Sequence, residues 1–86
     1  MSDYLSNTND FLSHIEEILE LTKGILTNNI NTKLDEIEEW DSLAIMSFIS
    51  FLDAELNIEI EADTLLECQS PQELFELTKK YLELNK

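Results

Sequence analysis

Apolar residues recur every three or four positions along three stretches of this chain, the spacing that places them on one face of an α-helix. The first stretch predicts a helix over residues 10–23, capped by Asn9 or Asp10 and ending just before Gly24. Residues 1–8 precede this pattern, and we expect them to form a mobile arm. The predicted apolar face of the first helix comprises Phe11, Leu12, Ile15, Ile18, Leu19 and Thr22.

The second stretch predicts the most apolar helix of the chain, from Ser42 to about Leu56. Leu43, Met46 and Phe51 fall away from its main face, and the pattern leaves open whether Met46 and Phe51 belong to the core. The predicted buried face comprises Ile45, Phe48, Ile49, Leu52 and Leu56. The predicted exposed face comprises Ala44, Ser47 and Ser50.

The last helix has the clearest start signal. Ser70 is a good N-cap, Pro71 suits the first helical position, and Glu73 completes a capping box. Just before it, residues 61–67 predict one or two helical turns around Leu65 and Leu66. The stretch Ile58-Glu59-Ile60 is too short for a sheet and predicts an extended connection. The apolar stripe of the last helix comprises Leu74, Leu77, Thr78, Tyr81 and Leu82.

The long connection between the first two helices is expected to be an ordered loop. Polar residues from Thr27 to Thr32 compete for backbone hydrogen bonds and disfavour a helix there. Apolar residues that recur through the connection predict that it is pinned to the core. They are Leu26, Ile30, Leu34 and Ile37.

The chain has one glycine and one proline, fewer than the tight turns of a strand-rich domain normally need. Its 86 residues, 43% of them apolar, suffice for one small core. We therefore predict an all-α fold, a bundle of three main helices plus one short helix. Residues 9–86 are expected to form a single domain.

Charge narrows the range of partners. The chain has 19 acidic residues and 5 lysines or arginines, which gives a formal net charge of −14. Nucleic acid and anionic membranes are poor partners because binding either one requires a basic patch, whereas basic protein surfaces fit. The N-terminus lacks the regions of a signal peptide, and no apolar segment approaches membrane-spanning length. We expect a cytoplasmic monomer without membrane insertion.

Three other features are expected to carry no chemistry. His14 has no second histidine or cysteine at ligand spacing, so we place it at the solvent edge. Cys68 is the only cysteine and is expected to be a small buried filler in a reduced protein. The acidic run from Asp35 to Asp41 lacks the Asp-x-Asp-x-Asp-Gly pattern of a calcium loop, so we interpret it as solvated. No metal site and no catalytic residue is predicted.

The candidate site is the turn that opens the second helix. Asp41 is a good N-cap, which puts Ser42 at the first helical position. Trp40 and Ile45 occupy the two positions of a hydrophobic staple. An anion bonded to Ser42 would lie at the positive end of the helix macrodipole. This turn is therefore a suitable place for a phosphate-linked group.

Several motifs occur together in a recognisable order. Asp41-Ser42-Leu43 opens the second helix, Asp53 and Glu55 lie near its end, and Ile58-Glu59-Ile60 and the cap Ser70 follow. With this order and acidity the chain resembles the acyl carrier protein family over roughly residues 10–84. The resemblance implies that Ser42 carries a covalent, phosphodiester-linked 4'-phosphopantetheine. The thiol of that arm would hold acyl, aminoacyl or polyketide groups as thioesters.

The resemblance also implies the partners. A phosphopantetheinyl transferase takes the group from coenzyme A with magnesium. The Ser42 hydroxyl is then the nucleophile, and Asp41 serves as the helix cap and lies near the metal of the transferase. Acyl-loading ligases or synthases act on the modified carrier, which is their substrate and not an enzyme.

Two departures from the family pattern indicate a specialised rather than a housekeeping carrier. Glu39-Trp40 stands where family members often have Gly-x, and the exposed face of the second helix lacks acidic residues. A more apolar docking surface is therefore expected. The expected partner-contacting residues are Glu39, Leu43, Met46 and Ser47. The alternative function is a small acidic helical interaction module without a prosthetic group, with Ser42 as an ordinary helix-start residue.

Overall fold

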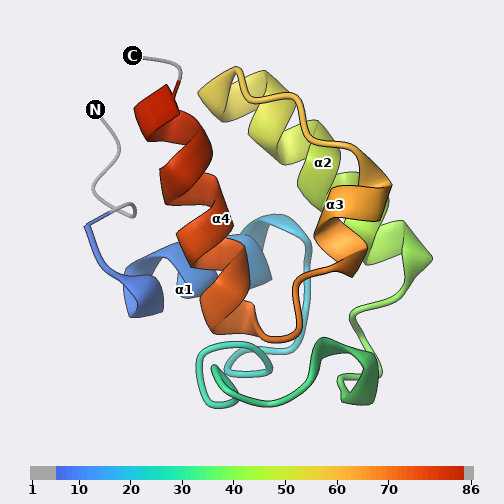
Figure 1. Cartoon of the computed structure of the whole chain (residues 1–86). Helices are drawn as coiled ribbons and strands as arrows, with labels where there is room; N and C mark the ends of the chain where they lie inside the picture. Colours follow the sequence, from blue (N-terminus) through green and yellow to red (C-terminus); the bar gives the residue numbers. More distant parts are fainter. Residues whose placement is uncertain (1–5, 85–86) are drawn as a thin grey trace.

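Four α-helices and one 3-10 turn form the regular structure of residues 6–84, the part of the chain that the computed structural model describes (Figure 1). No strand occurs within these residues. The predicted all-α fold of three longer helices and one short helix is confirmed. Residues 1–5 of the predicted arm lie outside the described residues, so its mobility stays a prediction. The elements are α1 (Thr8–Ile18), η2 (Leu34–Glu36), α2 (Ser42–Leu56), α3 (Ala62–Leu66) and α4 (Pro71–Leu84).

The helix α1 begins and ends earlier than the predicted 10–23. Its N-cap is Asn7, whose side chain accepts a hydrogen bond from the Asp10 N–H at 2.8 Å. The helix stops because Glu20 takes a left-handed conformation with φ 58°. The Glu20 and Leu21 N–H groups then donate to carbonyls of the last turn, which is the pattern of a Schellman motif. As a result Ile18, predicted to be in the core, is 41% exposed.

A buried carboxylate in α1 fixes the start of the long loop. Glu16 is nearly inaccessible to solvent, and its two oxygens accept hydrogen bonds from the backbone N–H groups of Gly24, Leu26 and Thr27 at 2.7–2.9 Å. Charge-assisted bonds of this kind compensate for the burial of the carboxylate. Gly24 has a φ of 90° within this loop, so its predicted place at the end of the first helix is wrong.

The helix α2 has the predicted bounds but a different buried face. Phe48 and Leu52 are in the core as predicted, whereas Ile45, Ile49 and Leu56 are only partly buried against it. Ala44 and Phe51 are buried, which corrects the exposed position predicted for Ala44 and decides the question left open for Phe51. The reason is that α2 is covered on more than one side: it packs against α3, and its aromatic residues also reach α1.

Aromatic contacts join the helices in the centre of the molecule. The ring of Phe11 in α1 lies edge-on to Phe48 of α2, with centroids 6.2 Å apart, and contacts Phe75 of α4 at 5.5 Å. The helix α1 runs across the lower half of α4 in Figure 1 and packs against it. These contacts hold α2 in a fixed position relative to the two other long helices.

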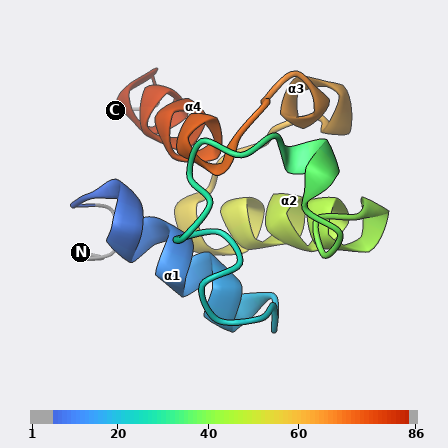
Figure 2. The same cartoon turned by 90° about the horizontal axis from the view of Figure 1, so that it is seen from below.

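The long loop covers the end of the bundle where α2 begins (Figure 2). Its apolar residues Leu26, Leu34 and Ile37 are buried, and two backbone hydrogen bonds join it to the connection before α4 and to the first turn of α4. The Leu34 N–H donates to the Gln69 carbonyl at 2.8 Å, and the Gln72 N–H donates to the Ile30 carbonyl at 3.0 Å. The prediction of an ordered loop pinned to the core is confirmed.

The start of α4 at Pro71 follows the prediction, with one difference in its capping. The Glu73 carboxylate accepts a hydrogen bond at 3.1 Å from the Gln69 N–H, one residue before the Ser70 N–H expected for a capping box. The connection around Ile58 and Ile60 has no regular structure, and both side chains are buried. The start of α4 is therefore at the predicted residue, with a modified capping bond.

Candidate functional site

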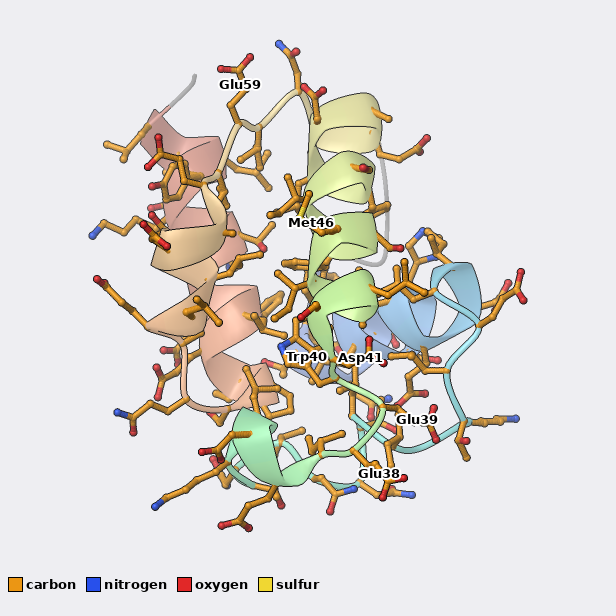
Figure 3. The ribbon with its side chains drawn as sticks, turned by 90° about the vertical axis from the view of Figure 1, so that its right-hand side faces the viewer. Glu38, Glu39, Trp40, Asp41, Met46 and Glu59 are labelled. Atoms are coloured by element: carbon orange, nitrogen blue, oxygen red, sulfur yellow. The ribbon has the colours of Figure 1, made fainter. Side chains whose placement is uncertain are left out.

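The turn into α2 is held by a cap and by a buried tryptophan. The Asp41 side chain accepts a hydrogen bond from the Ala44 N–H at 2.9 Å, so Asp41 is the N-cap and Ser42 the first helical residue, as predicted. Trp40 is 8% exposed and lies edge-on to Phe48, with ring centroids 5.7 Å apart. Trp40 and Ile45 line one cavity, which is consistent with their predicted staple positions. Figure 3 shows Trp40 and Asp41 at the foot of this helix.

The first turns of α2 present a hydroxyl and two large apolar side chains to solvent. Ser42 is exposed, Leu43 is 75% exposed and Met46 is 55% exposed. Figure 3 shows Met46 on the side of α2 that faces the viewer. Ser47, a predicted partner-contacting residue, is half-buried. Leu43 and Met46 are three positions apart and therefore lie on the same face of the helix. An incoming protein that reaches Ser42 would meet these two side chains first.

Glu39, a predicted partner-contacting residue, forms hydrogen bonds within the chain. One carboxylate oxygen accepts a hydrogen bond from the Thr22 N–H at 2.7 Å, and the other accepts one from the Thr22 hydroxyl. The Thr22 hydroxyl, and after it the Thr22 N–H, lowers the pKa of Glu39 from its ordinary value. Sequence reasoning missed this bond because the two residues are far apart in the chain and no local spacing links them.

A cavity lies beside the turn, between the 3-10 turn, α2 and α3. Its volume is about 390 Å³. Its apolar lining comes from Leu34, Trp40, Ile45, Leu65, Leu66 and Cys68. Lys33, Asp35 and Gln69 add polar groups to it. The start of α2 therefore combines an exposed hydroxyl with a neighbouring cavity of mixed character.

The one histidine of the chain lies away from Ser42, and its one cysteine is unreactive. The ring of His14 lies 5.8 Å from that of Phe51, about two and a half helical turns along α2 from Ser42. Burial first, and then the charges of Glu73 and Glu67, raise the pKa of the half-buried Cys68 to about 11, so it stays a thiol near neutral pH.

Two further findings concern the described residues 6–84. No group of three or more His, Cys, Asp or Glu side chains among them is arranged to hold a metal ion. In the same part of the chain, no helix has the length and apolar character needed to cross a membrane.

Comparison with known proteins gives one match. A model of the family described as "phosphopantetheine attachment site" matches residues 9–77, a range that runs from α1 into α4 and includes Ser42. No curated protein and no solved structure matches the chain significantly.

Proposed function

The chain belongs to the phosphopantetheine attachment site family, and on this premise we propose that Ser42 carries the prosthetic group of an acyl carrier protein. The cofactor of this family is 4'-phosphopantetheine, held in covalent linkage to a serine. The match covers most of the chain and agrees with the helical bundle, but it does not by itself say which serine is modified.

The position of Ser42 is the observation that supports its choice. The matched range contains five serines, namely Ser13, Ser42, Ser47, Ser50 and Ser70. Ser13 and Ser50 are exposed but lie in the middle of helices, and Ser47 is half-buried. Ser70 precedes α4 and is half-buried next to the long loop. Ser42 alone among the five combines an exposed hydroxyl with the first turn of a long helix.

The surroundings of Ser42 fit a phosphodiester. Ser42 lies in the N-terminal turn of α2, where free N–H groups and the macrodipole favour a negative charge. Asp41 keeps its carboxylate on the Ala44 N–H, so the cap holds the turn whether or not Ser42 is modified. The exposed Asp41 also lies next to Ser42, where it can approach the magnesium ion of a transferase.

In the proposed reaction the chain supplies the nucleophile. The Ser42 Oγ forms a bond to phosphorus, the phosphoanhydride bond of coenzyme A breaks, and the adenosine bisphosphate portion leaves. The hydroxyl proton passes to a base of the transferase, since His14 of α1 lies beside Phe51, far from Ser42. The attached arm supplies a thiol that binds acyl groups as thioesters. Leu43 and Met46 beside Ser42 would then contact the enzymes that load and use the acyl group.

The test is the intact mass after incubation of the unmodified protein with coenzyme A, magnesium and a promiscuous phosphopantetheinyl transferase. The mass should rise by one phosphopantetheinyl group. Ser42→Ala should abolish the gain without loss of helicity, and Ser50→Ala, which removes an exposed hydroxyl from the same helix, should keep it. Labelling of Ser42→Ala would move the site to another serine. Absence of labelling in the wild-type chain would favour the acidic interaction module instead.

A further inference from the structure

The residues just before Ser42 are fixed from two opposite directions. Ile37 and Trp40 point into the core and are almost completely buried. Between them, Glu39 points the other way and binds Thr22 in the loop that follows α1. Figure 3 shows Glu39 on the side of Trp40 that faces this loop. The turn into α2 is therefore held by apolar burial on one side and by a carboxylate on the other.

Both oxygens of the Glu39 carboxylate are used in this contact. The backbone N–H and the hydroxyl of Thr22 each donate to one of them, which fixes the orientation of the carboxylate as well as its distance. A single long-range bond would leave the glutamate free to rotate. Two bonds to one residue define a rigid tie between the loop and the turn.

The loop that carries Thr22 is itself anchored on both sides of this residue. Before Thr22, the left-handed Glu20 and the Schellman bonds end α1 in a defined direction. After it, the buried Glu16 carboxylate accepts three backbone hydrogen bonds from residues 24–27. Thr22 therefore has a defined position, and its hydrogen bonds hold Glu39 in place.

We propose, on the basis of the function proposed above, that Glu39 is a positioning residue for the modification of Ser42, and that it acts through Thr22 and not by contact with the transferase. The tie holds the segment Glu39-Trp40-Asp41 in the conformation that presents the Ser42 hydroxyl. On this proposal Glu39, predicted to contact a partner, acts within the carrier through its hydrogen bonds to Thr22.

The proposal predicts a specific kinetic signature. Without the tie, the turn samples other conformations, and only the fraction with Ser42 presented can bind productively. The apparent KM of the transferase for the carrier should therefore rise. The value of kcat should change little because the turn is ordered again once the complex has formed.

The kinetic experiment compares variants of the whole chain as transferase substrates. Glu39→Gln removes the charged acceptor and Thr22→Val removes the hydroxyl donor, and each should raise KM by about three- to tenfold. The two substitutions weaken the same tie, so their effects on KM should not multiply in the double variant. Thr22→Ser keeps the hydroxyl and should retain the wild-type KM. Glu38→Gln is the matched control because it removes the same charge from an exposed position one residue upstream.

A second measurement needs no transferase. Trp40 is the only tryptophan of the chain and directly follows Glu39, so its fluorescence reports on this turn. Glu39→Gln and Thr22→Val should shift its emission to the red and increase its quenching by acrylamide. Thr22→Ser and Glu38→Gln should leave both unchanged.

Two results would overturn the proposal. If Glu39→Gln raises KM in a salt-dependent way while Thr22→Val does not, Glu39 contacts the transferase through its charge. If neither variant changes the Trp40 signal, the tie does not order the turn. Failure of the proposed function is distinguishable from both, because it would appear as an unlabelled wild-type chain or a labelled Ser42→Ala, while the Trp40 measurement still decides whether Glu39 positions the turn.

Discussion

Leu43 and Ala44 are neighbours in the sequence and lie on different faces of α2, with the larger apolar side chain in solvent and the smaller one in the core. The inner face continues through Phe48, Phe51 and Leu52, all of them buried. The outer face continues to Met46, one helical turn from Leu43. The two large apolar side chains that lie close together in solvent are the reason for the docking role proposed for this face. The inner face therefore stabilises the fold, whereas the outer face stays accessible to other molecules.

The largest expected effect comes from the inner face. Phe48 is fully buried and contacts the rings of Phe11 and Trp40, so Phe48→Ala should lower the free energy of unfolding by about 3–5 kcal/mol. A domain of this size has little more stability than that, and the variant should be largely unfolded. Urea denaturation followed by circular dichroism measures the change. The matched control is Leu43→Ala, which should shift the free energy of unfolding by no more than about 0.5 kcal/mol. Equal losses in the two variants would erase the distinction between the faces.

The outer face should show the reverse behaviour in binding. Leu43→Ala should weaken docking to the cognate acyl-loading enzyme by about 1.5–3 kcal/mol, the value of burying a leucine. Asp53→Asn removes an exposed charge near the other end of α2 and should cost about 0–1 kcal/mol. The measurement is the apparent affinity in a kinetic assay at two salt concentrations. Should Asp53→Asn cost more than Leu43→Ala, with strong salt dependence, docking uses charge rather than apolar contact.

The sequence predicts those parts of the fold whose signals are local. The cap Asp41 and the proline Pro71 mark the starts of α2 and α4, and both starts are confirmed. The end of α1 was predicted wrongly because a glutamate, Glu20, adopts the left-handed conformation, and Gly24 offered a stronger but misleading signal. The helical period alone also misplaced Ala44, since it assumes a single buried face and α2 is covered on more than one side.

The candidate site shows the same difference between features with a local sequence signal and features that depend on the tertiary structure. The placement of Ser42 after its cap depends on adjacent residues and could be predicted from the sequence. The tie between Glu39 and Thr22, and the buried carboxylate of Glu16, join residues that no periodicity relates. Acidic residues are abundant in this chain, so composition could not single out these two. Only the folded loop shows which glutamates are used within the molecule.

A smaller effect is expected at Asp41, the N-cap of α2. Asp41→Ala removes the acceptor for the Ala44 N–H and should lower the free energy of unfolding by about 1 kcal/mol. Asp41→Asn keeps an acceptor oxygen and should lose much less. Thermal or urea unfolding of the three proteins, without any partner, gives the comparison. If Asp41→Ala is as stable as the wild type, then Trp40 and the inner face hold the helix start without the cap.

The smallest expected effect concerns the net charge of the whole molecule. With a formal net charge of −14, self-repulsion should lower the melting temperature at low ionic strength. Screening improves as the Debye length falls from about 30 Å at 0.01 M salt to about 10 Å at 0.1 M. We expect sodium chloride to add up to about 1 kcal/mol over this range, a rise of a few degrees in Tm. Because repulsion acts on the whole molecule, Leu43→Ala should show the same rise as the wild type. A flat or falling melting temperature would mean that the acidic residues are already compensated, and a different salt response in Leu43→Ala would connect the outer face to stability after all.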